Sequence, residues 1–189
     1  RSLLTSREIR SNLINSIDDK SCQVGVIGLG YVGLPTMMSI AESGFRVTGI
    51  DVDVDRVAQL KNGDSYIDDV SSEVIEELFK AKSISATSDY AVIRDLDVIL
   101  VCVPTPITLH KEPDMGPLAA AIESLAEYIR QGQLVILQST TYPGTTEEFV
   151  LPRLESSGRR AGNDFYLAFA LERIDPGNNN FNVKNVPKV

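Results

Sequence analysis

The sequence contains little of several residue types that carry common protein chemistry. Its 189 residues include two cysteines, one histidine and no tryptophan. Two cysteines do not resemble the disulfide framework of a small secreted domain, so we expect free thiols in a cytoplasmic protein. The cysteines and the histidine are not spaced as metal ligands, and no metal site is expected.

Positive charge and long hydrophobic runs are scarce as well. The 18 lysines and arginines are outnumbered by 26 aspartates and glutamates, which gives a net charge of −8. Nucleic acids bind to basic surfaces, so this balance argues against a nucleic-acid partner. No apolar run approaches the ~18 residues of a membrane span, and the N-terminus lacks the apolar core and cleavage site of a signal peptide. We therefore expect no membrane partner.

Glycine is concentrated in one place, between an expected buried strand at 24–27 and an expected helix at 36–43. Gly28 permits a tight turn out of the strand, Gly30 lets a pyrophosphate approach the backbone, and Gly33 lets the helix pack closely on the strand. The first turn of the helix then offers free amides to the phosphates. The loop reads Gly28, Leu29, Gly30, Tyr31, Val32 and Gly33.

A G-x-G-x-x-G pattern alone is weak evidence, because glycine-rich surface turns are common. Here, however, a second expected strand at 45–50 ends in Asp51. A carboxylate about 20 residues after the glycines can accept both hydroxyls of an adenosine ribose. A phosphate-loop NTPase is excluded, since no Gly-Lys-Ser/Thr follows the glycines. The combination predicts a dinucleotide-binding site.

Strands and helices alternate along the rest of the chain. Asp55 is expected to cap the first of the later helices, and Pro152 to divide the last. The alternation predicts an α/β fold, a doubly wound parallel sheet of the Rossmann type with right-handed crossovers. The later strands are expected at 83–87, 97–103, 134–138 and 165–170, and the later helices at 56–60, 71–80, 89–94, 117–130 and 145–156.

The chain divides into three expected segments. Residues 1–20 have apolar residues at helical spacing and predict an amphipathic N-terminal extension. Residues 21–175 form the dinucleotide-binding domain. Residues 176–189 are rich in Asn and Pro, without periodicity, and are interpreted as an exit linker.

Ligands of such sheets bind outside the carboxyl ends of the strands, where Thr140 and Glu172 are expected to lie. Thr140 either caps the next helix or turns its hydroxyl to the nicotinamide end of the cofactor. Glu172 is either solvated or has a catalytic or cofactor role. His110 lies in a polar loop and is expected to be solvated, and Cys102 is expected to be a buried, inert thiol.

Five stretches together resemble a known family, the NAD-dependent nucleotide-sugar 6-dehydrogenases (the UDP-glucose/GDP-mannose dehydrogenase family). They extend over nearly the whole chain, from about residue 22 to 189. The last two are more similar to the branch that acts on UDP-N-acetylhexosamines than to the UDP-glucose branch. The stretches are 25–35, 103–106, 112–114, 139–145 and 172–178.

The resemblance implies a four-electron oxidation with NAD as cofactor. The C6 alcohol of the sugar becomes an aldehyde, a cysteine captures it, and the resulting thioester is hydrolysed to a carboxylate. Thr140 and Glu172 would orient or activate water in that hydrolysis, and Asp51 and Arg56 would hold the adenosine ribose. The further residues implied to line the cofactor are Val103, Pro104, Thr105, Pro106 and Ser139.

The family's catalytic cysteine, its lysine and its UDP-sugar-binding domain would follow Val189, so this chain resembles the cofactor half of a homo-oligomeric, dimeric enzyme. The chain departs from the family at Ala170 and Leu171, where the family has Ser-Pro. Two alternatives stay open at this point. One is a stand-alone NAD-binding module, and the other is the cofactor domain of a hydroxyacid dehydrogenase.

Overall fold

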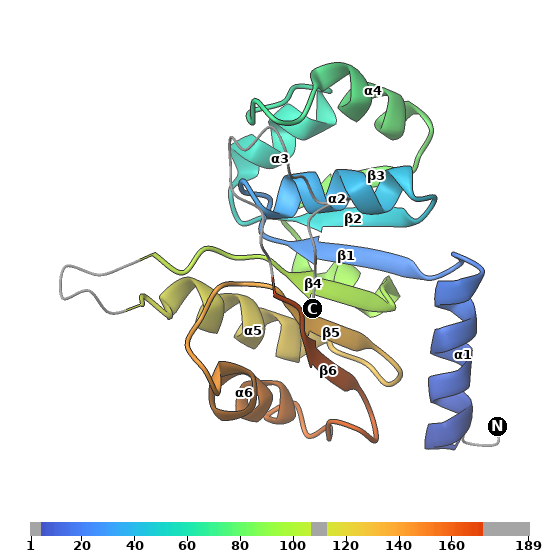
Figure 1. Ribbon diagram of the computed structural model, residues 1–189, viewed down its shortest axis with the longest axis vertical. Helices are drawn as coiled ribbons and strands as arrows, with labels where there is room; N and C mark the ends of the chain where they lie inside the picture. The colour runs from blue at the N-terminus through green and yellow to red at the C-terminus, as the bar shows by residue number, and fades with distance from the viewer. Residues whose placement is uncertain (1–4, 107–112, 172–189) are drawn as a thin grey trace.

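The computed structural model describes residues 5–106 and 113–171. The predictions for His110, Glu172 and the linker at 176–189 lie outside these residues. The described residues form one six-stranded sheet in the order β3-β2-β1-β4-β5-β6, and every strand pair is parallel (Figure 1). This order reverses direction between β1 and β4, which is the switch point of a doubly wound sheet.

The elements follow the expected alternation. The strands are β1 (Gln23–Ile27), β2 (Arg46–Ile50), β3 (Ile84–Thr87), β4 (Val98–Val101), β5 (Leu134–Leu137) and β6 (Tyr166–Phe169). The α-helices are α1 (Ser6–Asp18), α2 (Gly33–Glu42), α3 (Val54–Lys61), α4 (Ser72–Lys80), α5 (Gly116–Tyr128) and α6 (Leu151–Glu155). The other helical segments are the 3-10 helix η1 (Tyr90–Asp95) and the π-helix η2 (Thr145–Val150).

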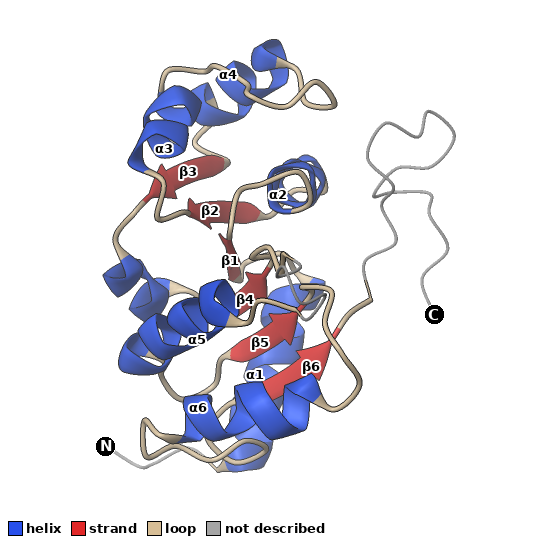
Figure 2. Cartoon of the chain, turned by 90° about the vertical axis from the view of Figure 1, so that its left-hand side faces the viewer, coloured by secondary structure: helices blue, strands red, loops and turns tan. Residues whose placement is uncertain are grey.

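The sheet is apolar on both faces because it is covered on both. Side chains alternate along a strand, so in β1 Val24 and Val26 belong to one core cluster while Ile27 belongs to the other. The first cluster includes residues of α1 to α4, and the second includes residues of η1, α5 and α6. Figure 2 shows α2 and α5 on opposite sides of the sheet. The continuous hydrophobic runs of the sequence are thus explained.

The structure corrects three local expectations. The cap of α3 is Asp53 and not Asp55, because Asp53 has the extended backbone and its carboxylate accepts the N–H groups of Asp55 and Arg56. Strand β4 ends at Val101, earlier than expected. The segment 89–94 is largely a 3-10 helix. Pro152 divides the last helical segment as expected, since η2 ends and α6 begins just before it.

Helix α1 lies across the amino ends of the strands, away from the glycine-rich loop (Figure 1). A capping box between Thr5 and Glu8 starts the helix, and its own residues Ile9 and Leu13 are buried. The Cys22 N–H bonds to the carbonyl of Ser16, which ties the end of α1 to the start of β1. The helix is therefore part of the packed structure but remote from the carboxyl ends of the strands.

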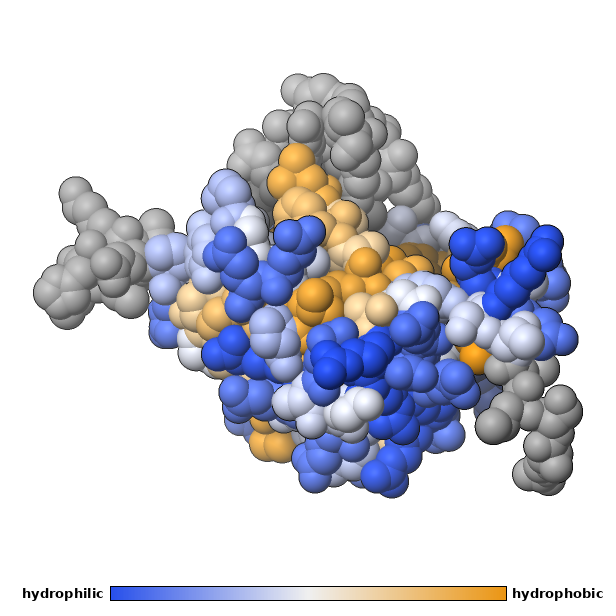
Figure 3. All heavy atoms as spheres, turned by 90° about the horizontal axis from the view of Figure 1, so that it is seen from below, coloured by the Kyte–Doolittle hydropathy of each residue, from blue (hydrophilic) through white to orange (hydrophobic). Residues whose placement is uncertain are grey.

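The face of the molecule seen from below is mainly hydrophilic. Hydrophobic residues gather on it in a strip that runs upward from the middle, with smaller patches elsewhere (Figure 3). In the part of the chain that the structure describes, no helix is both long and apolar enough to cross a membrane.

Candidate dinucleotide site

The three glycines of the loop meet three different surroundings. Gly28 has a φ of +87°, and a Cβ on it would lie 2.9 Å from the Cys102 carbonyl oxygen. A Cβ on Gly33 would overlap the Gly28 carbonyl and lie 2.9 Å from its carbon. A Cβ on Gly30 would meet nothing within 4 Å. Gly28 and Gly33 are thus required by the turn and by helix packing, whereas Gly30 keeps space open.

The N-terminus of α2 faces this open space. Its N-cap is Val32, and no side chain caps the helix. The first N–H groups of a helix lack partners within the helix and carry the positive end of its dipole. An anion placed over Gly30 could therefore accept hydrogen bonds from these amides, because no capping side chain competes for them. The loop fits the pyrophosphate of a dinucleotide.

Asp51 directly follows β2, and its carboxylate is held in place by hydrogen bonds from the backbone. It is buried, its Oδ2 accepts the Leu29 N–H at 2.7 Å, and its Oδ1 accepts the Asp53 N–H at 2.9 Å. Arg56 Nη1 lies 3.6 Å from Asp51 Oδ2, and Arg56 Nε lies 3.4 Å from Asp53 Oδ2. Each carboxylate oxygen has more than one lone pair, so Asp51 can still accept the hydroxyls of a ribose.

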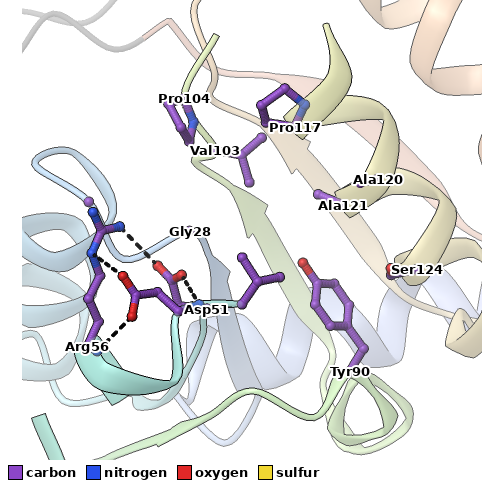
Figure 4. Close-up of a pocket in the computed structure, with 13 residues that line it drawn as sticks. Gly28, Asp51, Arg56, Tyr90, Val103, Pro104, Pro117, Ala120, Ala121 and Ser124 are labelled. Atoms are coloured by element: carbon purple, nitrogen blue, oxygen red, sulfur yellow. Dashed lines mark hydrogen bonds and ion pairs between the residues drawn. The ribbon is translucent and has the colours of Figure 1, made fainter. Parts of the chain in front are cut away.

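A cavity of about 360 Å³ opens beside Asp51 (Figure 4). Asp51 and Arg56 line one side, residues of α5 line the other, and Tyr90 lies between them. Burial raises the pKa of Tyr90 to about 12, so its hydroxyl stays a donor at neutral pH. The cavity suits a flat apolar base with polar edges. Its lining residues are Gly28, Gly30, Asp51, Val52, Asp53, Arg56, Tyr90, Val103, Pro104, Pro117, Ala120, Ala121 and Ser124.

A second cavity, of about 310 Å³, continues over the ends of β4 and β5. It shares Gly30, Arg56, Val103 and Pro104 with the first, so the two flank the glycine-rich loop as the halves of a dinucleotide would. Its lining residues are Gly30, Tyr31, Val32, Arg56, Cys102, Val103, Pro104, Thr105, Gln138, Ser139 and Thr140.

Two hydroxyls fix the walls of this second cavity. Ser139 Oγ donates to the Val103 carbonyl at 2.8 Å, and Thr105 Oγ1 donates to the Thr140 carbonyl. The loops after β4 and β5 are thereby bonded to each other, although they lie far apart in the sequence. Ser139 therefore shapes the cavity through its hydroxyl in addition to lining it.

Thr140 does not cap a helix. The next helical segment, η2, begins at Thr145 with Gly144 as its N-cap and without a side-chain cap. Thr140 is instead exposed and lines the second cavity. The capping interpretation is therefore wrong, and a role of Thr140 at the nicotinamide end of a cofactor stays a prediction.

Most of the expected cofactor residues line these two cavities, but three do not. Leu29 and Gly33 are buried beneath the loop, and Pro106 is exposed and lines neither cavity. Sequence reasoning also missed the wall opposite Asp51, which Tyr90 and the residues of α5 provide. The position of Tyr90 shortly after the end of β3 could have indicated a place at the site. The first half of α5, in contrast, has only the pattern of an ordinary helix.

The two cysteines are both free and buried. Burial raises the pKa of Cys22, which lies at the amino end of β1. Cys102 lies in the second cavity, and its Sγ donates to Gln138 Oε1 at 3.4 Å. Among the described residues, no group of three or more His, Cys, Asp or Glu side chains is placed to hold a metal ion.

A 3-2-1-4-5-6 parallel sheet with an uncapped glycine-rich turn at its switch point defines a Rossmann-type dinucleotide-binding domain. The chain belongs to the UDP-glucose/GDP-mannose dehydrogenase family, because the model of that family's NAD binding domain matches residues 22–189. NAD is the cofactor of this domain, and the family expected from the sequence is confirmed.

Relatives support the same assignment. The chain is 40% identical over 171 residues to a UDP-N-acetyl-D-glucosamine 6-dehydrogenase of Pseudomonas aeruginosa, covering 90% of this chain and 40% of that protein. It is 35% identical over 158 residues to a UDP-N-acetyl-D-mannosamine dehydrogenase of Pyrococcus horikoshii, covering 82% of this chain and 37% of that protein.

A solved structure agrees with the fold. The NDP-N-acetyl-D-galactosaminuronic acid dehydrogenase of Methanosarcina mazei Go1 superimposes with a TM-score of 0.82 at 30% identity, covering 93% of this chain and 38% of that one. The chain thus spans about two fifths of the length of the relatives it matches.

The site predicts NAD over NADP. A 2′-phosphate on the ribose would approach the carboxylates of Asp51 and Asp53, and Arg56 is already shared between them. Repulsion between two unit charges costs about 4 kcal/mol at ~4 Å and an effective dielectric of ~20, before screening. Titration calorimetry is expected to show NAD bound at least about tenfold tighter than NADP, a difference of ~1.4 kcal/mol.

Two variants sharpen this measurement. Asp51→Asn removes the buried charge and is expected to lower the ratio of NAD to NADP affinity. Asp55→Asn removes a neighbouring exposed charge that does not line the 360 Å³ cavity, and should leave the ratio unchanged. Equal affinities in the unchanged protein would contradict the role of Asp51.

Proposed function

We propose that this chain is the NAD-binding part of a cytoplasmic, dimeric dehydrogenase that oxidises the C6 alcohol of a UDP-N-acetylhexosamine to the carboxylate. The substrate is UDP-N-acetylglucosamine or UDP-N-acetylmannosamine, and the product serves polysaccharide precursor synthesis. The observation that carries the proposal is the 40% identity to the Pseudomonas aeruginosa UDP-N-acetyl-D-glucosamine 6-dehydrogenase over 90% of this chain.

The proposed reaction converts one alcohol and one water into a carboxylate. It consumes two NAD⁺ and releases two NADH and three protons. Bound NAD supplies the hydride acceptor. The residues of this chain bind and orient: the α2 amides hold the pyrophosphate, Asp51 and Arg56 hold the adenosine ribose, and Ser139 fixes the wall at the nicotinamide end.

Thr140 is proposed to position the water used in the second half of the reaction. Its place in the 310 Å³ cavity supports this role, as does its lack of a capping function. The proposed partner in this step is Glu172, whose position is outside the described residues. The thiol that captures the aldehyde is proposed to belong to the remaining three fifths of a protein of the relatives' length.

This 189-residue chain is expected to bind NAD but to produce no NADH from UDP-sugars. Holding the sugar C6 against the nicotinamide is a matter of positioning, which supplies up to ~7–11 kcal/mol of such a barrier. Neither thiol is expected to act as the nucleophile: Cys22 is buried just before β1, and Cys102, although it lines the 310 Å³ cavity, is buried and donates to Gln138 Oε1. The measurement is NADH absorbance with UDP-N-acetylglucosamine, UDP-N-acetylmannosamine and UDP-glucose.

The positive arm uses a protein of the relatives' length that contains this chain. It should release two NADH per molecule of its preferred UDP-N-acetylhexosamine, and Thr140→Ala should lower kcat. Thr48→Ala, on β2 and bonded to Ser85, is the control. Steady NADH production by the 189-residue chain that survives Thr140→Ala and Cys102→Ala would show that the active site lies elsewhere.

A further inference from the structure

The backbone of Leu29, in the glycine-rich loop, is held from two sides. Its N–H donates to Asp51 Oδ2 at 2.7 Å, and its carbonyl accepts the hydroxyl of Tyr66 at 2.7 Å. Tyr66 comes from the connection between α3 and α4, 37 residues further along the chain. Both polar backbone groups of Leu29 are therefore fixed by side chains, one from the end of β2 and one from a distant loop.

The second of these bonds has a consequence for Gly30. The described residues contain no cis peptide bond, so the Leu29 carbonyl and the Gly30 N–H point in opposite directions across one planar unit. A carbonyl turned to Tyr66 therefore turns the Gly30 N–H away from it. Gly30 lines both cavities of the dinucleotide site. We propose that Tyr66 is a positioning residue, whose hydroxyl sets the peptide orientation that the loop presents to the pyrophosphate of NAD.

Tyr66 is itself placed firmly enough for this role. Its side chain is half-buried, and the Arg56 guanidinium lies 5.8 Å from the centre of its ring. Arg56 in turn pairs with Asp51, so the ring is connected to the carboxylate that holds the other side of Leu29. Burial, and then the Asp51 charge, raise the pKa of Tyr66, so the hydroxyl stays protonated and remains a donor at neutral pH.

The test compares the 189-residue chain with two variants. Tyr66→Phe removes the hydroxyl and keeps the ring under Arg56. Tyr166→Phe is the control: it also removes a tyrosine hydroxyl that donates to a backbone carbonyl, that of Ser6 at 3.4 Å, but at the α1 end of the sheet. The ligands are NAD⁺ and ADP-ribose, which contain the pyrophosphate, and adenosine, which does not. Thermal unfolding of all three proteins is recorded beside the titrations.

Tyr66→Phe is expected to weaken NAD⁺ and ADP-ribose about 3- to 10-fold, the range of one lost hydrogen bond, and to change adenosine by less than about twofold. Tyr166→Phe should change none of the three affinities. Unchanged NAD⁺ affinity in Tyr66→Phe would overturn the inference. Equal weakening of all three ligands would overturn it too, because it would show a general structural effect.

The proposed role of Tyr66 depends on NAD binding in this cleft, and the experiment distinguishes failure of that role from failure of NAD binding. If the unchanged chain does not bind NAD⁺, the assignment of the cleft fails and this inference fails with it. If the unchanged chain binds NAD⁺ and Tyr66→Phe binds it equally well, only the role of Tyr66 fails.

Discussion

Gly30→Val is expected to abolish NAD binding while leaving the free energy of unfolding nearly unchanged. The position accepts a side chain, because a Cβ there meets nothing within 4 Å and the backbone of Gly30 lies outside the left-handed region. The added side chain would instead occupy the space through which the pyrophosphate reaches the α2 amides. We expect affinity for NAD to fall at least about 100-fold, or ~2.7 kcal/mol.

The measurement is a calorimetric titration of both proteins, together with urea unfolding. Adenosine is the control ligand, since it carries no phosphate to place over Gly30 and its affinity is expected to fall less than that of NAD. Unchanged NAD affinity in Gly30→Val would mean that the glycines serve the turn alone and that the cofactor lies elsewhere.

Gly33→Ala is expected to act differently from Gly30→Val. It should lower the stability of the fold rather than block the NAD site directly. Its Cβ would overlap the carbonyl group of Gly28 and lie 3.3 Å from the Cβ of Cys102. Both neighbours belong to the backbone or to a packed strand end, so neither can move without shifting the first turn of α2. We expect the free energy of unfolding to fall by about 3 kcal/mol or more.

The urea midpoint measures this loss. Gly158→Ala offers a comparison, because a Cβ there meets nothing within 4 Å, although its φ of +82° carries a local strain of its own. That strain, about 1–2 kcal/mol, should be smaller than the effect at Gly33. A midpoint for Gly33→Ala equal to that of the unchanged chain would show that α2 is not packed against the loop.

The strand positions, the parallel doubly wound class of sheet and the glycine-rich turn could be predicted, because each follows from the pattern of residues along the chain. Apolar runs such as 98–101 mark strands buried on both faces, and the glycine pattern marks a tight turn at which Gly28 and Gly33 leave no room for a side chain. Asp51 could be predicted as a site residue from its spacing after the glycines. The carboxyl ends of parallel strands meet at one edge, which brought the strand-end residues together without any knowledge of their contacts.

Other features could not be predicted, because they depend on contacts between distant segments. Both Asp53 and Asp55 are suitable helix caps by residue type, and only the backbone conformation chooses Asp53. Tyr66 lies in an irregular connection, so nothing in its neighbours indicates a bond to Leu29. Tyr90 and Ser124 line the first cavity only because η1 and α5 pack on the same face of the sheet.

Binding of NAD in the cleft at the β1/β4 switch point is tested most directly by titration of the 189-residue chain with NAD⁺. We expect saturable binding with one site per chain, lost in Gly30→Val and weaker with NADP. A chain that unfolds cooperatively and yet shows no saturable heat with NAD⁺, or that binds NAD⁺ equally well as Gly30→Val, would contradict it.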